Sequence, residues 1–96
     1  DALPYVTEVH GNYPNPFNPE TTISFSLAEE GEVSLSIYNS RGQLVAKLVD
    51  SYLATGKHNV MWNGKDTNGR EVSSGIYLYR LESGSFIIPG KMILLK

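Results

Sequence analysis

The sequence predicts an all-β domain: an antiparallel β-sandwich of about seven strands, with the strand number and spacing of immunoglobulin-like (Ig-like) and fibronectin III-like domains. Two observations support this prediction. Apolar and polar residues alternate with a period of two in most segments, and short clusters of Gly, Asn, Asp, Ser and Pro separate these segments at regular intervals. No segment has the apolar period of a convincing helix.

The clearest strands lie on either side of an acidic turn, residues 28–32. In both strands apolar residues alternate with serine, so each has one inward face and one serine-rich outward face. Because only a short turn with one glycine separates them, we expect an antiparallel hairpin. The expected inward residues are Ile23, Phe25, Leu27, Val33, Leu35 and Ile37.

The next strand is expected at residues 43–49, with either Leu44 and Leu48 or Val45 and Val49 on its inward face. The sequence leaves this register open.

The second half of the chain predicts a strand at residues 56–63 and a hairpin made by residues 76–82 and 86–96. Pro89-Gly90 interrupts the last of these strands. Proline cannot donate a hydrogen bond to a sheet, so this dipeptide indicates a bulge or an edge position. The inward residues that complete the expected core are Val60, Trp62, Tyr77 and Tyr79.

A proline-rich segment, Tyr13-Pro14-Asn15-Pro16-Phe17-Asn18-Pro19, precedes the first clear strand. Each proline fixes its own φ and pushes the residue before it toward extended geometry. We therefore expect the segment to run straight along a sheet edge and to begin a domain that covers residues 13–96. Residues 1–12 are expected to be a linker with a possible first strand near Tyr5 to Val9.

Composition and the distribution of apolar residues argue against several classes of partner, and against a membrane span or a leader in this sequence. The net charge is −2 and the eight basic residues are scattered, which argues against nucleic acid and anionic membranes. The absence of cysteine excludes disulfides and thiol chemistry. No apolar run approaches the length of about 20 residues that a membrane span needs, and no leader is recognisable, so we expect a part of a larger protein.

No set of residues has the pattern of a catalytic site. His10 and His58 lack convergent partners, so both are interpreted as surface or rim histidines. Glu29, Glu30 and Glu32 share one turn, where carboxylates are normally solvated and discourage aggregation of sheet edges. The chain is therefore not expected to be an enzyme.

Two segments suggest a ligand and also have a simpler interpretation. Residues 66–71 resemble part of a calcium loop, but the oxygen ligands are incomplete, and Asp66 can instead cap backbone amides in an ordinary turn. Trp62 could form an exposed sugar platform, but a lone tryptophan in a small sandwich is more often a core residue. We expect no metal, cofactor or small-molecule substrate.

The last six residues join an alternating strand to a basic terminus. One interpretation is that a partner binds them, with strand addition along an exposed edge as one mode of binding. The other is that Ile93 and Leu95, or Met92 and Leu94, fill the core at the end of a hairpin. The residues concerned are Lys91, Met92, Ile93, Leu94, Leu95 and Lys96.

Taken together, these motifs resemble two related families: the type A C-terminal sorting domains of the type IX secretion system, and the Ig-like domain of flagellar hook-capping proteins. The resemblance covers residues 13–96 and depends on the order of the motifs. Its opening motif corresponds to Pro14, Asn15, Pro16, Phe17, Asn18 and Pro19, its central motif to residues 33–39 with Gly42-Gln43, and its closing motif to Lys91–Lys96. Gly56-Lys57-His58 and Trp62-Asn63-Gly64 also fit.

The resemblance implies a non-catalytic module that directs a larger protein through the periplasm and the outer membrane, to the cell surface or the medium. Its implied partners are outer-membrane components of the type IX translocon and cargo domains upstream in the same polypeptide. The alternative is a passive structural module of a surface protein, a multidomain enzyme or a hook-cap-like protein. A natural terminus at Lys96 would favour the sorting function.

Overall fold

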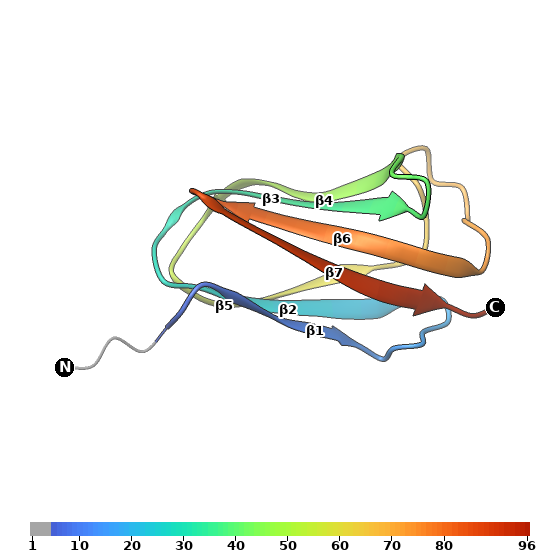
Figure 1. Ribbon diagram of the computed structural model, residues 1–96, viewed down its shortest axis with the longest axis horizontal. Coiled ribbons are helices and arrows are strands. Elements are labelled where there is room, and N and C mark those ends of the chain that lie inside the picture. Colours follow the sequence, from blue (N-terminus) through green and yellow to red (C-terminus); the bar gives the residue numbers. More distant parts are fainter. Residues whose placement is uncertain (1–4) are drawn as a thin grey trace.

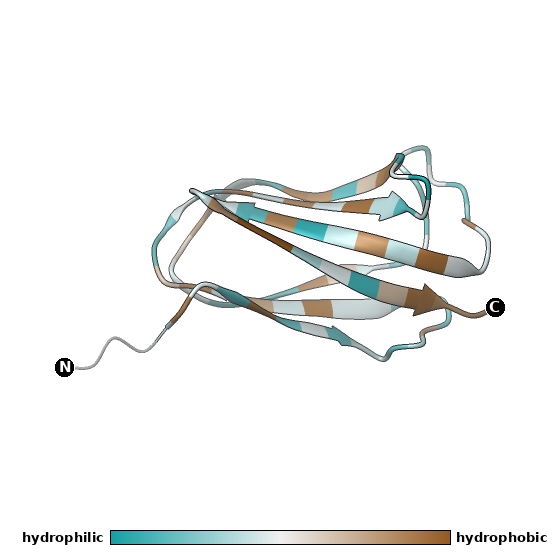
Figure 2. Ribbon diagram, in the orientation of Figure 1, coloured by the Kyte–Doolittle hydropathy of each residue, from teal (hydrophilic) through white to brown (hydrophobic). Residues whose placement is uncertain are grey.

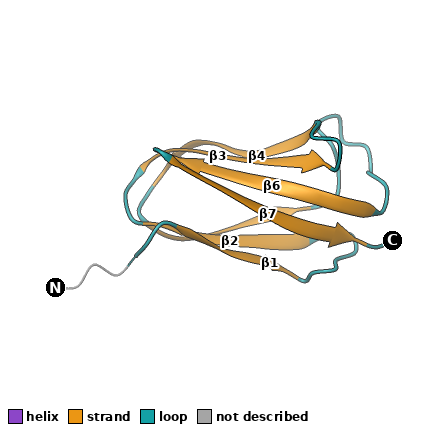
Figure 3. Cartoon of the chain, in the orientation of Figure 1, coloured by secondary structure: helices purple, strands orange, loops and turns teal. Residues whose placement is uncertain are grey.

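The computed structural model describes residues 5–96 and consists of two antiparallel sheets packed face to face (Figure 1). The three-stranded sheet has the order β1-β2-β5 and contains β1 (Glu8–Tyr13), β2 (Thr21–Leu27) and β5 (Gly56–Trp62). The four-stranded sheet has the order β4-β3-β6-β7 and contains β3 (Gly31–Asn39), β4 (Leu44–Leu53), β6 (Gly75–Ser83) and β7 (Phe86–Leu94). The predicted all-β sandwich is confirmed, and the described residues contain no helix (Figure 3).

One apolar core lies between the two sheets. Figure 2 shows hydrophobic and hydrophilic residues alternating along the strands, as burial of one face requires. Val60 is only partly buried, because β5 is an edge strand, and Phe17, Met92 and Leu94 join the core from the two ends of the chain. The other expected core residues are all buried: Ile23, Phe25, Leu27, Val33, Leu35, Ile37, Trp62, Tyr77 and Tyr79.

The hairpin expected between the first two clear strands is wrong. β2 pairs with β1 and β5, whereas β3 pairs with β4 and β6 in the opposite sheet. The acidic turn therefore carries the chain across the space of about 10 Å between the sheets. Alternation shows which face of a strand is buried. It does not show whether the next strand along the chain pairs with it in the same sheet or packs against it from the opposite sheet.

Two expectations about the first strand need correction. The strand begins at Glu8 and ends at Tyr13, later than the expected Tyr5 to Val9, and its pairing with β2 shifts register between Val9 and Gly11. This bulge breaks the period of two, so alternation in the sequence does not show where the strand begins and ends. Strand β1 thus precedes the proline-rich segment as part of the sandwich. Residues 1–4 of the expected linker lie outside the described residues.

Strand β4 is longer than expected and contains the cause of its unclear register. Its pairing with β3 shifts twice, between Leu35 and Ser36 and between Ile37 and Tyr38. As a result two consecutive residues, Val45 and Ala46, are both buried. Neither simple alternation could describe this strand.

The final hairpin has the expected pairing. β6 and β7 pair without a register shift, from Gly75 opposite Leu94 to Ser83 opposite Phe86. Pro89-Gly90 therefore marks an edge position, because β7 is the outer strand of its sheet, and not a bulge.

Candidate recognition site at the C-terminal strand

The two faces of the C-terminal strand have different environments. Met92 and Leu94 are completely buried, so they are the pair that fills the core. Ile93 is 36% exposed and Leu95 is 55% exposed. Lys91 is exposed on the same face as Ile93. Side chains available to a partner are therefore those at odd-numbered positions.

The proline-rich segment is hydrogen-bonded to this strand. The backbone N–H of Phe17 donates to the carbonyl of Ile93 (2.9 Å), and the N–H of Leu95 donates to the carbonyl of Phe17 (3.0 Å). The N–H of Ile93 donates to Oδ1 of Asn15 (3.0 Å). The opening and closing motifs, 78 positions apart, thus form one continuous surface.

The path of the proline-rich segment differs from the expectation. It lies at a sheet edge, but bends at residues 14–16 and 18–19 instead of running straight. The bends are necessary because β1 and β2 are antiparallel neighbours, so their connection must reverse the chain. Thr21 stabilises this reversal from a buried position: its hydroxyl donates to the carbonyl of Pro14 (2.8 Å) and accepts a hydrogen bond from Asn12 Nδ2 (3.0 Å).

Three aromatic rings support the site from inside the sandwich. The ring of Phe17 lies 5.7 Å from that of Trp62, and Trp62 lies 5.3 Å from Tyr77 in an edge-on arrangement. The polar atoms of this cluster have partners: Trp62 Nε1 donates to the backbone carbonyl of Lys65 (2.9 Å), and the hydroxyl of Tyr77 donates to the backbone carbonyl of Ser73 (2.7 Å). Trp62 is 1% exposed, which excludes a sugar platform.

The loop of residues 63–74 closes the same end of the sandwich. Gly64 has a φ of +76°, and a Cβ there would lie 2.9 Å from the carbonyl oxygen of Pro19. Asp66 Oδ1 accepts hydrogen bonds from the backbone N–H groups of Asn68 (2.9 Å) and Arg70 (3.0 Å). Asp66 thus caps an ordinary turn, which was the simpler interpretation of this segment.

The same loop contacts the last residue. The N–H of Lys96 donates to Ser74 Oγ (2.9 Å), and its Nζ lies 3.4 Å from Glu71 Oε1. The C-terminal segment, residues 91–96, is therefore enclosed between two loops: the proline-rich segment and residues 71–74.

A packing constraint explains the glycine of the dipeptide Pro89-Gly90. The ring of Tyr79 lies across Gly90, so a Cβ at this position would overlap the ring. Tyr79 is almost completely buried, and burial raises the pKa of its hydroxyl above the usual value.

Exposed apolar side chains extend from β7 onto the neighbouring strand. Ile76 pairs with Ile93, and Leu78 pairs with Lys91, so these residues share the outward face of the sheet. Ile76 is 47% exposed and Leu78 is 37% exposed. The site therefore offers an apolar patch next to a positive charge.

The two histidines are not brought into a site. His10 is exposed, with Nδ1 3.7 Å from Glu8, while His58 stacks on Phe25 and its Nε2 lies 2.7 Å from the carbonyl of Ala54. Residues 5–96 contain no group of three His, Cys, Asp or Glu residues arranged to hold a metal ion. Within the same range, no helix is long and apolar enough to span a membrane.

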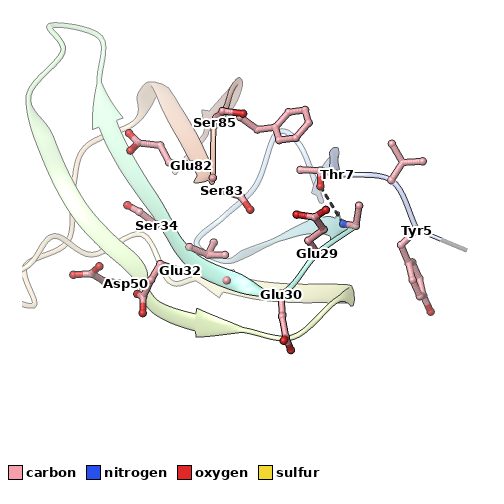
Figure 4. Close-up of a pocket in the computed structure, with 16 residues that line it drawn as sticks. Tyr5, Thr7, Glu29, Glu30, Glu32, Ser34, Asp50, Glu82, Ser83 and Ser85 are labelled. Atoms are coloured by element: carbon pink, nitrogen blue, oxygen red, sulfur yellow. Dashed lines mark hydrogen bonds between the residues drawn. The ribbon is translucent and has the colours of Figure 1, made fainter. Parts of the chain in front are cut away.

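The acidic turn lines an open hollow of about 820 Å³ at the opposite end of the sandwich (Figure 4). Glu29, Glu30 and Glu32 lie there with Asp50 and Glu82. The turn is held to residues 5–7 by a hydrogen bond from the N–H of Ala28 to Thr7 Oγ1 (3.0 Å). The carboxylates surround solvent, as expected for charges on a turn.

Sequence reasoning missed the contact between the two motifs. A usable signal was present: Phe17 is a large apolar residue inside an otherwise polar and proline-rich segment, which predicts that this segment is attached to the core. The sequence held no such signal for the partner of Asn15, because Asn15 accepts its hydrogen bond from a backbone N–H, that of Ile93.

The sandwich, its seven strands and its antiparallel pairing define the chain as an Ig-like β-sandwich domain. The family model of the FlgD Ig-like domain matches residues 12–85, and the chain belongs to this family. No curated protein matches the chain.

Several solved structures have the same fold. Dimeric latent PorU from Porphyromonas gingivalis matches with a TM-score of 0.73 and 22% identity, over 94% of this chain and 9% of that one. PorZ, an essential surface component of the type-IX secretion system of the same organism, matches with a TM-score of 0.64 and 22% identity, over 92% and 11%. FlgD from Xanthomonas campestris, a hook-capping protein, matches with a TM-score of 0.63 and 19% identity, over 92% and 64%.

At these identities the likeness concerns the fold alone. The chain spans 11% of the length of PorZ and 9% of that of PorU. It thus has the size of one domain within those larger proteins.

Proposed function

We propose that the chain is a non-catalytic sorting domain of the type IX secretion system, which directs a larger protein through the outer membrane to the cell surface or the medium. Its partners are outer-membrane components of the translocon, and its cargo is the rest of the same polypeptide. It needs no cofactor, metal, nucleic acid or small-molecule substrate. The resemblance of its opening, central and closing motifs to sorting domains, together with the fold shared with PorZ, supports this proposal.

One observation carries the proposal furthest. The proline-rich segment and the C-terminal segment are hydrogen-bonded to each other, although they lie at opposite ends of the motif order. A purely structural sandwich needs only the buried members of β7, Met92 and Leu94. The exposed Lys91 and Leu95 have no comparable structural role and are available to a partner.

A passive structural module remains the second candidate, and the family favours it. The FlgD Ig-like model matches most of the chain, and FlgD itself is a hook-capping protein. In this case the domain acts only as a rigid spacer or connector. The two functions differ in what they require of exposed residues.

Export of a reporter tests the proposal. Residues 1–96 are fused to a reporter with a periplasmic leader, in a host that has the secretion system. Deleting residues 91–96 would also remove two core side chains, so point variants at outward positions are the better choice. The double variant Lys91→Glu/Leu95→Ser changes only exposed side chains. Ile87→Ser, at a 64% exposed position of the same strand, is the matched control.

We expect the reporter outside the cell for the parent and for Ile87→Ser, and in the periplasm for the double variant. Circular dichroism melting should verify that all three domains are folded. No export of the parent, or equal export of all three, would remove the sorting function and leave the structural module.

A further inference from the structure

β7 is the outer strand of its sheet, so the backbone N–H and carbonyl groups along one of its edges have no partner strand in the sheet. In an antiparallel pair, residues whose backbone groups point at the partner strand alternate with residues whose groups point away. Ile93 and Leu95 use their backbone groups outside the sheet, toward Asn15 and Phe17. By the same alternation, the backbone groups of residues 87, 89 and 91 also point away from β6.

This edge has no continuous row of donors. Proline at position 89 has no N–H, so the middle of the open stretch offers only an acceptor. Farther along, the N–H and carbonyl of Ile93 and the N–H of Leu95 are already bonded to the proline-rich segment. An incoming strand would find unpaired N–H groups only at Ile87 and Lys91. Such an interrupted edge disfavours strand addition.

We propose that Asn15 is a positioning residue that fixes the C-terminal segment, so that a partner binds its outward side chains and does not add a strand to its edge. This inference rests on the proposed sorting function. The partner would present an apolar recess bordered by carboxylates. That chemistry complements the exposed Ile76, Ile93 and Leu95 and the positive charge of Lys91.

Asn15 is suited to this role because its effect is local. Its side chain is exposed, and its Oδ1 accepts the hydrogen bond of the Ile93 N–H. Phe17, in contrast, is buried against Trp62, so its removal would disturb the whole core. Asn15 can therefore be changed without changing the sandwich.

Hydrogen exchange of residues 1–96, measured by NMR, tests the positioning directly. Asn15→Ala removes the acceptor, Asn15→Asp keeps an oxygen at the same place, and Asn18→Ala is a matched control at an exposed asparagine that also precedes a proline. In Asn15→Ala we expect the Ile93 amide to exchange at least about tenfold faster, while amides in the centre of β3 and β6 keep their rates. Asn15→Asp and Asn18→Ala should match the parent.

An unchanged rate at Ile93 in Asn15→Ala would overturn the proposal. Equal acceleration of all core amides would overturn it too, because Asn15 would then act on global stability.

The same variants in the reporter assay test the mode of recognition. We expect export to fall several-fold for Asn15→Ala and to be restored in Asn15→Asp. Higher export in Asn15→Ala would mean that the partner adds a strand to the released edge, and it would overturn the proposal, as would unchanged export. If the parent itself is not exported, the sorting function fails, and the exchange rates still decide whether Asn15 fixes the C-terminal segment.

Discussion

At one end of the sandwich the C-terminal segment is enclosed by two loops, whereas at the other end the acidic turn borders a hollow that is open to solvent. The enclosed end has the Phe17, Trp62 and Tyr77 rings beneath it and side-chain hydrogen bonds across it. The open end carries carboxylates that neighbour each other. The same pair of sheets thus supports one end with a defined geometry and one end with solvated charge.

The difference between the two ends shows where a surface of fixed geometry can form. A partner that recognises a particular arrangement of side chains needs a backbone that does not move, and two loops that are hydrogen-bonded to the C-terminal residues provide it. The acidic turn, in contrast, places exposed carboxylates around an open hollow. The following predictions test this contrast in order of decreasing change in stability.

Removal of a core aromatic should have the largest effect. Trp62→Ala removes a completely buried ring at the enclosed end, and we expect unfolding free energy to fall by about 3–5 kcal/mol. Phe25→Ala, which also removes a completely buried ring, should cost a similar amount. Urea denaturation followed by circular dichroism measures both, and a curve that overlays the parent's would contradict the prediction.

Glycine substitutions compare the two ends directly. Gly64 and Gly84 both have positive φ, but a Cβ at Gly64 would meet the backbone of Pro19, whereas a Cβ at Gly84 would meet nothing within 4 Å. We expect Gly84→Ala to cost about 1 kcal/mol through its backbone conformation alone. Gly64→Ala should cost about 2–4 kcal/mol because the clash is added. Equal costs in denaturation experiments would show that the enclosed end is not tightly packed.

The loop at the enclosed end should depend on Asp66 and not on a metal. Asp66→Ala leaves two backbone N–H groups without their acceptor, and we expect a loss of about 1 kcal/mol. Treatment of the parent with EDTA should leave its melting temperature unchanged. A fall of the melting temperature that calcium restores would make Asp66 and Asn68 metal ligands.

The acidic turn should be the least sensitive region. The triple variant Glu29→Gln/Glu30→Gln/Glu32→Gln removes three exposed charges, two from the turn and one from the start of β3, where the structure places Glu32 instead of in the turn. We expect the unfolding free energy to change by less than about 0.5 kcal/mol, with a slight gain at low salt because like charges no longer repel. Thermal melting at low and high ionic strength measures this change, and a large loss would mean that the carboxylates have a structural role.

The core could be predicted from the sequence to a large extent because burial leaves a local signature. Phe25 and Trp62 each belong to a strand whose alternation identifies the inward face, whichever strand lies beside it. The signature fails where the backbone is irregular. The bulges in β1 and β4 each insert a residue, and the period of two is lost there.

The candidate site was predicted as two separate motifs. The sequence indicated that Lys91–Lys96 form a strand with two possible faces, but the choice of Met92 and Leu94 as buried residues depends on the register with β6. It also placed the proline-rich segment at a sheet edge. The sequence did not indicate which edge this is; the structure shows that it is the end of β7.

Neighbouring residues were enough to predict a small β-sandwich and most of the side chains that face its core, because the alternation that buries one face of a strand is a local pattern. The separation of β2 and β3 into opposite sheets and the hydrogen bond from the Ile93 N–H to Asn15 became visible only in the folded chain. Such contacts involve at least one backbone group from a distant segment. Every residue except proline carries the same N–H and carbonyl, so the side chains do not encode which of them will meet.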